Sequence, residues 1–305
     1  MKIGVNLINF GPSANPENLR RWATLSEDFG YHMLMTSDHV AMTPDVQARY
    51  PAPLYEPLSM LGWLAGVTRN IAIGSTVIIL PYRNPLEVAR AFANIDQLSG
   101  GRCILGVGVG WAEQEFATLN VPFHKRGAIS NEYLAVIKQA WTEEKSSFDG
   151  EFIQFTDVQN APLPAQKPHP PIWVGGKSPG ALRRAVKYGD GWHPLRMTVK
   201  WLRDTGIVQL ADMADREGRK MPDICPRLTL RLTDTDLDDD ERTAGEGSLD
   251  QIRGDMRGLE ELGCSHVLLD TFTGDVGATR NPEHAWRMYE TLAEKIFDLG
   301  REAVR

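Results

Sequence analysis

The chain has 305 residues, of which 42% are hydrophobic, so it is long enough for a substantial core or for one large α/β barrel. A net charge of -7 argues against nucleic acid or a membrane surface as the main partner. No apolar run reaches the ~20 residues that cross a membrane, and the three cysteines lie too far apart for a disulfide framework. These features favour a cytoplasmic protein.

Segments typical of strands and of helices alternate along the whole chain. Apolar runs predict strands over residues 2–10, 31–38, 70–80, 102–110, 171–176, 190–195, 225–234 and 265–271. Amphipathic runs with capping residues predict helices over residues 15–30, 56–68, 84–101, 129–144, 178–189, 198–218, 248–263 and 282–300. The alternation predicts an α/β fold, a single-domain (β/α)8 TIM barrel over residues 1–305, with a doubly wound open sheet as the alternative.

Two segments interrupt the alternation and are interpreted as insertions. Residues 146–170 predict a small hairpin followed by a proline-rich connection. Residues 234–247 are rich in acidic side chains, which is typical of a solvated loop. Neither has the composition of a domain linker, so one domain is expected.

Active sites of such barrels form where the strands end, so the residues at those positions are the candidates. Asp38 and His39 follow the second predicted strand, and His39 can exchange a proton near neutral pH. An isolated histidine at a strand end can equally be structural. Gly108 and Gly110 alternate along the fourth strand before Trp111, and bare backbone there would accommodate a flat ring.

The run "GGKSPG" lies between the fifth strand and its helix. Gly175 and Gly176 allow a tight turn, and the amides that follow can bind a phosphate together with the charge of Lys177. The alternative is an ordinary βα loop with Ser178 as the N-cap. Phosphate sites near the later strands of a barrel favour the first interpretation.

Other chemistries find no matching pattern in the sequence. The histidines outside position 39 form no ligand-spaced cluster, and HExxH is absent, so no metal site is expected. No GxSxG nucleophile elbow occurs either. The reaction chemistry is therefore expected to come from an organic cofactor.

At this point the sequence resembles a known family. "TSDHV", "GSTVIILPYRNPLEVARAFANIDQLSGGRCILGVGVGW" and "PPIWVGGKSPGALRRAVKYGDGWHP" are similar, in this order, to the bacterial luciferase-like flavin and deazaflavin oxidoreductases. "GVGVGW" with "EQEF" and "VPFHKRG" most resembles the branch that uses coenzyme F420. The resemblance implies F420, or alternatively FMN, bound at the strand ends with its ring inward and its phosphate outward.

The resemblance also implies roles for individual residues. Asp38 would contact the polar edge of the ring, and His39 would assist proton transfer. A bulge with a non-prolyl cis peptide, most naturally at Thr76–Val77, is expected within the third strand. The implied cofactor contacts are Asp38, Ser75, Thr76, Val77, Gly108, Gly110, Trp111, Gly175, Gly176, Lys177 and Ser178.

Trp111 stands where the sugar-phosphate dehydrogenase of this family carries a catalytic glutamate, which points to a more apolar small-molecule substrate. Side chains that would line its pocket are Tyr55, Tyr82, Trp192 and Met197. A homodimer is expected, because family members often pair through barrel helices. Three functions fit these features: an F420-dependent oxidoreductase, an FMNH2-dependent monooxygenase served by a separate reductase, and a catalytically silent cofactor-binding protein. For the first, too, a separate F420 reductase is a possible partner.

Overall fold

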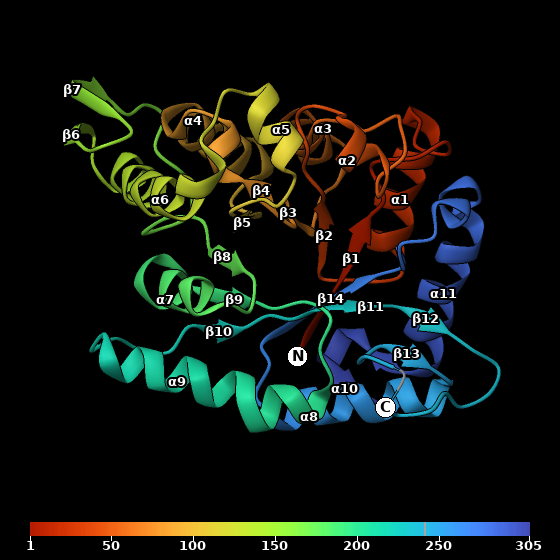
Figure 1. The fold of residues 1–305 in the computed structure, drawn as a ribbon. Coiled ribbons are helices and arrows are strands. Elements are labelled where there is room, and N and C mark those ends of the chain that lie inside the picture. The colour runs from red at the N-terminus through yellow and green to blue at the C-terminus, as the bar shows by residue number, and fades with distance from the viewer. Residues whose placement is uncertain (241) are drawn as a thin grey trace.

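The computed structural model describes residues 1–240 and 242–305, in which a curled sheet of parallel strands is surrounded by helices (Figure 1). The sheet contains β1 (Lys2–Leu7), β2 (Met33–Thr36), β3 (Ala72–Ser75), β4 (Ile78–Ile79), β5 (Cys103–Gly108), β8 (Ile172–Gly175), β9 (Gly191–His193), β10 (Asp223–Ile224), β11 (Arg227–Thr229) and β14 (His266–Asp270). Their order is β10-β9-β8-β5-β3-β2-β1-β14-β11, with β4 also paired to β5. From β1 to β10, the strands of this sheet therefore follow the order of the chain, with β3 and β4 both paired to β5.

The helices cover the outer face of this sheet (Figure 1). They are α1 (Pro16–Asp28), α2 (Pro44–Gln47), α3 (Pro57–Val67), α4 (Pro85–Ser99), α5 (Glu113–Thr118), α6 (Arg126–Thr142), α7 (Pro179–Tyr188), α8 (Val199–Trp201), α9 (Ile207–Arg216), α10 (Leu249–Glu261) and α11 (Pro282–Lys295). The predicted α/β class and the alternation of strands and helices are confirmed.

The two ends of the strand order belong to one stretch of chain, because β10 and β11 are separated only by Cys225 and Pro226. On one side, the Cys225 amide donates to the Trp192 carbonyl at 2.8 Å. On the other, the Leu268 amide donates to the Pro226 carbonyl at 2.9 Å. Pro226 has no N–H to donate, and it separates β10 from β11. The predicted strand over residues 225–234 is observed as β11 and β12 (Arg231–Leu232), because β11 pairs with β14 whereas β12 pairs with β13 (Glu246–Gly247) outside the main sheet.

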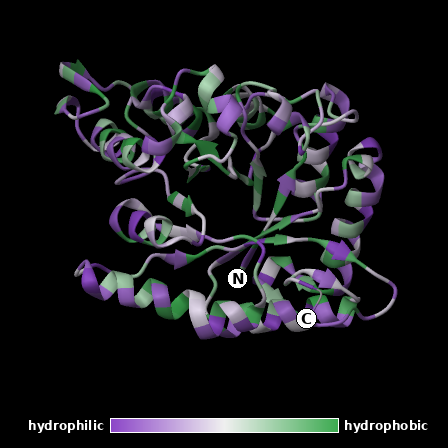
Figure 2. Ribbon diagram, viewed as in Figure 1, coloured by the Kyte–Doolittle hydropathy of each residue, from purple (hydrophilic) through white to green (hydrophobic). Residues whose placement is uncertain are grey.

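The core has two layers. Apolar side chains on the outward face of the strands, such as Leu34 and Leu105, pack against the helices. A smaller inner cluster, which includes Met35 and Trp173, fills the inside of the curled sheet. Figure 2 shows the helices as mixtures of hydrophobic and hydrophilic residues, as expected when only one face of each helix is buried.

Capping residues set where the helices begin and end. The Asn15 side chain accepts from the Asn18 amide at the start of α1, and α4 ends at Gly100, which has a φ of 70°. At α10, Ser248 and Gln251 form a capping box. The predicted helix over 282–300 instead ends at Lys295, because β15 (Phe297–Asp298) turns back to pair with β16 (Ala303–Val304).

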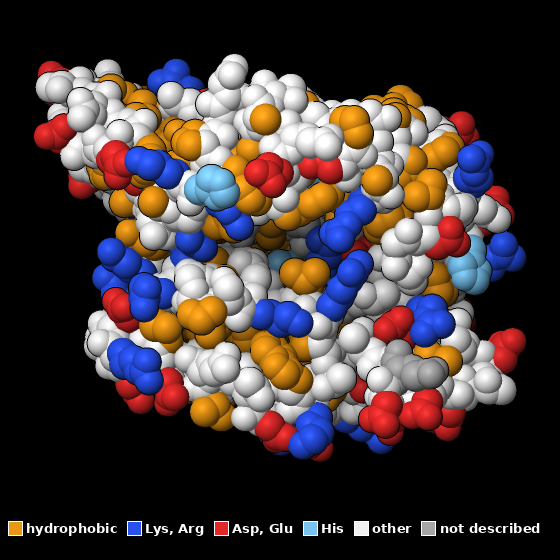
Figure 3. Space-filling view, viewed as in Figure 1, with side chains coloured by type: hydrophobic (Ala, Val, Ile, Leu, Met, Phe, Trp, Pro, Cys, Tyr) orange, Lys and Arg blue, Asp and Glu red, His pale blue; other side chains and the backbone are white. Residues whose placement is uncertain are grey.

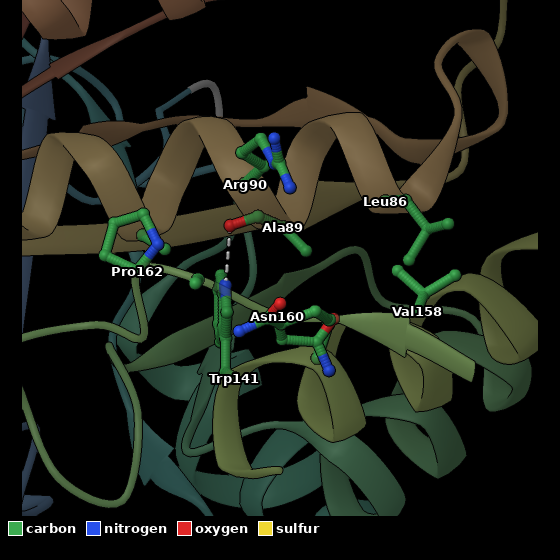
Figure 4. A pocket seen from close by; sticks show the side chains of 11 residues that line it. Leu86, Ala89, Arg90, Trp141, Val158, Asn160 and Pro162 are labelled. Carbon is green, nitrogen blue, oxygen red and sulfur yellow. Dashed lines mark hydrogen bonds between the residues drawn. The ribbon is translucent and has the colours of Figure 1, made fainter. Parts of the chain in front are cut away.

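Both predicted insertions fall outside the main sheet. β6 (Lys145–Asp149) and β7 (Gln154–Gln159) form the expected hairpin. In the acidic segment 234–247, residue 241 lies outside the described residues, and β13 (Glu246–Gly247) pairs with β12 (Arg231–Leu232). The chain after the hairpin packs on α4 around a small pocket lined by Arg90, Trp141, Asn160 and Pro162 among others (Figure 4).

Within residues 1–240 and 242–305, no helix combines the length and the apolar composition that a transmembrane span needs. The same residues contain no group of three or more side chains arranged to hold a metal ion.

Candidate active site

The carboxyl ends of the parallel strands meet at one edge of the curled sheet and bring the candidate residues together. His39 follows β2, Trp111 follows β5 and Lys177 follows β8. Figure 3 shows a hollow across the middle of one face of the molecule, with Lys and Arg side chains gathered along it. Because β2, β3, β5 and β8 pair in parallel, the residues that follow them lie at the same edge of the sheet although they are far apart in the chain.

His39 is buried and bound to a carboxylate that the sequence did not single out. Its Nδ1 lies 2.6 Å from Oε2 of Glu115, a residue of α5 whose side chain is completely buried. The other oxygen, Oε1, accepts from the amides of Val40 at 2.6 Å and Ala41 at 2.9 Å. Burial opposes the charge of Glu115, but the hydrogen bonds from His39, Ala41 and Val40 outweigh it and lower the pKa of this carboxyl.

An ionised carboxylate only accepts hydrogen bonds, so Nδ1 of His39 must carry a proton. The neutral ring then has Nε2 as its basic nitrogen, and Nε2 has no hydrogen-bond partner among the described residues. This arrangement fixes the orientation and tautomer of an imidazole whose second nitrogen can take or return a proton. Glu115 is thus a positioning residue for His39.

Asp38 forms bonds within the protein that the sequence did not predict. Its two oxygens accept from Nη1 and Nη2 of Arg83 at 2.7 and 2.8 Å, and Oδ2 also accepts from the Ile79 amide. Burial raises the pKa of Asp38, although the hydrogen bonds from Arg83 and Ile79 favour its charged form. Through these hydrogen bonds, Asp38 at the end of β2 contacts both β4 and Arg83, which follows β4 in the chain. Its contact with a cofactor ring stays a prediction.

The expected bulge separates β3 from β4, and the Thr76–Val77 peptide is cis, as the resemblance implied. Ser75 Oγ donates to the Gly106 carbonyl at 2.8 Å and accepts from the Gly106 amide at 3.1 Å. The Ser75 hydroxyl thus replaces the ladder bonds that the bulge interrupts. A β-carbon at position 106 would lie 1.9 Å from the Ser75 carbonyl oxygen.

The glycines of β5 therefore have a cause within the protein. A β-carbon at Gly108 would lie 2.6 Å from Cγ2 of Val77, and one at Gly110 would lie 2.7 Å from Ile79 and 2.8 Å from Phe116. The sequence interpretation assigned these glycines to a flat ligand, whereas the structure packs the bulge of the third strand against them. Gly108 and Val77 keep some solvent-accessible surface at the strand end, so a ligand contact there stays a prediction.

A buried polar network lies behind the bulge. Arg227 Nη1 donates to the Thr76 carbonyl at 2.6 Å, and the same guanidinium pairs with Asp270 at 2.6 Å. Thr76 Oγ1 lies 2.9 Å from Nε2 of His193, whose Nδ1 bonds the Cys225 carbonyl. A carbonyl only accepts, so Nδ1 of His193 is protonated and Nε2 accepts from Thr76. Burial lowers the pKa of His193 to about 4, so this ring is neutral at pH 7.

The loop between β8 and α7 has the expected turn. Gly176 has a φ of 108°, which favours glycine, and Ser178 caps α7 by accepting from the Ala181 amide. Lys177 Nζ donates to the Arg196 carbonyl at 2.7 Å. Burial and the nearby charge of Arg196 both lower the pKa of Lys177. Ser178 is therefore the N-cap of α7, as the interpretation of an ordinary βα loop expected. The cationic side chains of Lys177 and Arg196 lie beside this loop.

The four side chains expected to line a substrate pocket do not gather in this structure. Trp192 is fully buried and donates to the Gly176 carbonyl at 2.8 Å, and Met197 lies in the main core. Tyr82 packs on Phe116 in a small separate cluster. Tyr55 is half-buried against the main core. Large apolar residues near strand ends were thus drawn into packing, which is their commonest role.

Sequence reasoning missed three site residues: Glu115, Arg83 and Arg227. Glu115 lies in "EQEF", where every second residue is acidic and a solvated helix is the natural interpretation. The available signal is the neighbouring Phe116, which marks the buried face of that helix. Arg83 follows β4 and Arg227 is the first residue of β11, and a buried arginine at the end of a strand often pairs with a carboxylate from another strand.

Comparisons with known proteins identify the family of this chain. The sequence model of the luciferase-like monooxygenase family matches residues 1–254. The chain is 34% identical over 181 residues to the F420-dependent glucose-6-phosphate dehydrogenase of Kineococcus radiotolerans, covering 58% of this chain and 52% of that protein. It is 32% identical over 142 residues to the FMNH2-dependent dimethylsulfone monooxygenase of Pseudomonas putida, covering 46% of this chain and 39% of that protein.

Among solved structures, the coenzyme F420-dependent tetrahydromethanopterin reductase from Methanopyrus kandleri has a TM-score of 0.77 at 16% identity, covering 96% of this chain and 97% of that one. At this identity the likeness concerns the fold. The matches span 64%, 52% and 39% of the length of three of the curated relatives, less than two thirds in each case. Because the family model matches most of the chain, the resemblance seen in the sequence is confirmed, and the protein belongs to the luciferase-like monooxygenase family.

Proposed function

We propose that the protein is an oxidoreductase that transfers hydride between F420 and a small organic substrate. The observation that carries the proposal is the buried pair of His39 and Glu115 at the carboxyl end of the sheet, in a chain of this family. F420 is favoured over FMN because the F420-dependent relative is matched over 181 residues and the FMNH2-dependent one over 142.

The phosphate end of either cofactor fits the loop before α7. Lys177 and Arg196 lie close enough for the charge of Arg196 to lower the pKa of Lys177. Neither forms an ion pair with a carboxylate among the described residues. A phosphate bound beside Gly176 and the N-terminus of α7 would relieve this repulsion and accept from free amides. These residues therefore fit an anionic ligand.

The ring end of the cofactor fits the strand ends between that loop and His39. Val77, Gly108 and Gly175 keep accessible surface there, whereas most of their strands are buried. Trp111 is partly exposed beside His39, with ring centroids 5.7 Å apart. Together they offer backbone and apolar surface to a flat ring, with one titratable nitrogen at its side.

When bound, a deazaflavin or flavin supplies two-electron chemistry that no side chain can provide. The residues of this chain supply orientation and proton handling. Glu115 holds the proton on Nδ1 of His39, so that Nε2 can accept a proton from the reacting molecule or return one to it. Trp111 adds apolar surface beside the imidazole, since the two ring centroids lie 5.7 Å apart.

The second candidate is an FMNH2-dependent monooxygenase that receives its reduced flavin from a separate reductase. The relative from Pseudomonas putida favours it. A catalytically silent cofactor-binding protein is the third, and the buried acid–imidazole pair argues against it, because an ionised carboxylate buried for no function is costly.

Titration of the purified protein with F420 and with FMN separates the first two candidates. F420 fluorescence should be quenched at micromolar protein, and FMN should bind more weakly. Tight FMN binding without measurable affinity for F420 would refute the F420 assignment. Loss of turnover in His39→Ala with cofactor binding retained would exclude the silent protein.

We further propose that the curled sheet closes as a single-domain (β/α)8 barrel in a cytoplasmic homodimer. The hydrogen bonds of residues 223–230 to β9 on one side and β14 on the other support closure. The three free cysteines, all buried, suit a reducing compartment. Sedimentation of the purified protein tests the dimer.

A further inference from the structure

Aromatic side chains from four loops meet beside His39. We call Phe10, Tyr50, Trp111 and Phe272 the aromatic wall; they follow β1, β2, β5 and β14 in turn. Phe10 lies 5.0 Å from Tyr50 and 4.9 Å from Phe272 between ring centroids. Tyr50 lies 6.5 Å from Trp111. The centroid of the His39 ring is 5.1 Å from that of Tyr50, so the wall borders the imidazole ring of His39.

Within the aromatic wall, Phe10 and Phe272 are buried, and Trp111 keeps an apolar surface open to solvent. Five large hydrophobic side chains are exposed among the described residues, and three of them, Val40, Trp111 and Leu195, follow the ends of β2, β5 and β9. Single exposed apolar residues are ordinary, but their concentration around one end of the sheet is typical of a binding surface. Trp111 is 38% exposed although its ring contacts His39 and Tyr50, so one part of the indole remains available.

The side chain of Arg49 lies over the ring of Trp111. The Arg49 guanidinium lies 4.7 Å from the centroid of the Trp111 ring. It has no ion pair and no side-chain hydrogen bond within the part of the chain that the structure describes. Two other arginines at the strand ends are bound to carboxylates, Arg83 to Asp38 and Arg227 to Asp270. A stacked guanidinium keeps its N–H edge free, and that edge matches a carboxylate in two-point geometry.

We propose that this surface binds a planar, unsaturated substrate that carries an anionic group. The ring of the substrate packs on Trp111 and Tyr50 next to His39, and its anion pairs with Arg49. This substrate class rests on the proposed function. It differs from a sugar phosphate, whose hydroxyl groups would find mainly aromatic carbon at the wall, and from a neutral aliphatic compound, which leaves Arg49 without a partner.

The test measures binding of four probes by calorimetry, with the protein alone and with F420 or FMN added. The probes are 2-naphthoate, its neutral counterpart 2-naphthol, the non-planar anion cyclohexanecarboxylate, and glucose 6-phosphate. We expect 2-naphthoate to bind about tenfold more tightly than 2-naphthol, the scale of one charge-assisted hydrogen bond. Cyclohexanecarboxylate and glucose 6-phosphate should bind more weakly than 2-naphthoate.

Variants assign the effect to residues. Arg49→Gln should reduce 2-naphthoate affinity to that of 2-naphthol and leave 2-naphthol unchanged. Trp111→Leu should weaken both planar probes about fivefold, since stacking is lost in each case. The matched control is Arg69→Gln, an exposed arginine before β3, at the opposite end of the strands, which should change nothing.

Equal affinity for 2-naphthoate and 2-naphthol, or cyclohexanecarboxylate binding as tightly as 2-naphthoate, would overturn the proposal. So would the absence of binding in every form of the protein. The cofactor titrations are read separately: a protein that binds neither F420 nor FMN contradicts the proposed function, whatever the probes do.

Discussion

The replacement Glu115→Gln tests how His39 is held. A glutamine has the shape of the native side chain but offers one acceptor and one donor, whereas the carboxylate accepts three hydrogen bonds, from His39, Val40 and Ala41. The amide oxygen is expected to keep the two backbone amides. The NH2 group then faces Nδ1 of His39, and the imidazole proton moves to Nε2. The basic nitrogen would thus point away from the reacting molecule.

The size of the effect follows from these contacts. Each hydrogen bond to a buried charged group is worth about 1.5–3 kcal/mol, and the variant keeps neutral versions of them, so we expect a loss of about 2 kcal/mol in the free energy of unfolding. Loss of a correctly placed general acid–base should lower kcat by a factor of about 100 to 10,000. Cofactor affinity should change little, because Glu115 is buried behind His39.

Nitrogen-15 chemical shifts of the His39 ring report the tautomer directly, and steady-state kinetics report kcat and KM. Glu113→Gln is the matched control, an exposed glutamate of the same helix. A variant whose tautomer inverts while kcat stays within twofold of wild type would refute the proton-handling role of His39. An unchanged tautomer would refute the positioning role of Glu115.

The stability difference should also depend on pH. The folded protein holds the pKa of Glu115 below its usual value of 4.5, so the carboxylate contributes stability above that value. This contribution is lost as the pH falls through the lowered pKa of the folded state. The wild-type advantage over Glu115→Gln should therefore be complete at pH 7 and shrink below about pH 4.

Three further predictions concern other parts of the site. Lys177→Ala should weaken cofactor binding by about 1–2 kcal/mol, since one charge-assisted contact with phosphate is lost; unchanged affinity in a fluorescence titration would contradict the phosphate assignment. Gly108→Ala should destabilise the protein by about 1–3 kcal/mol through its clash with Val77, and adding Val77→Ala should restore most of that loss in urea unfolding; a single variant as stable as wild type would disprove the contact. Burial lowers the pKa of His193 from 6.5 to about 4, so its contribution to stability is present above pH 6.5 and is lost as the pH falls to about 4. His193→Gln should lose less stability than wild type across that window, and equal losses would show that the ring is not buried neutral.

Much of the fold could be predicted because the signals are local. The apolar runs and capping residues of each βα unit are contiguous in the chain, so helices such as α3 and α7 begin and end close to their predicted bounds. The positions at which predicted strands and helices are interrupted were harder to predict from the sequence. The run over residues 70–80 predicts one continuous strand, and its bulge at Thr76–Val77 was expected only because of the family resemblance; the pairing of Ile78 and Ile79 with β5 shows how the strand resumes after it. Similarly, residues 296–304 turn back as a short hairpin although their sequence continues a helical pattern.

The sequence indicated at which end of the sheet the candidate site lies, but not which of its residues form hydrogen bonds with one another. His39 and the loop before α7 follow strands whose ends must meet at one edge, so topology alone brings them together. Glu115 could not be assigned, because its partners lie 74 to 76 residues earlier in the chain. The sequence explained the glycines of β5 by a ligand alone, and it did not indicate that Val77, in the bulge between β3 and β4, excludes a side chain at Gly108.

The bond between Glu115 and the amides of residues 40 and 41 has a consequence for how this protein can diversify. The chain that follows, residues 42–56, departs from an anchor tied to α5, so we expect changes in its composition to leave His39 in place. Tyr50 and Arg49 belong to this stretch. Directed libraries confined to residues 43–53 are therefore expected to yield catalysts with altered substrate preference and an intact proton-transfer residue, whereas libraries that include Glu115 are expected to yield mostly inactive chains.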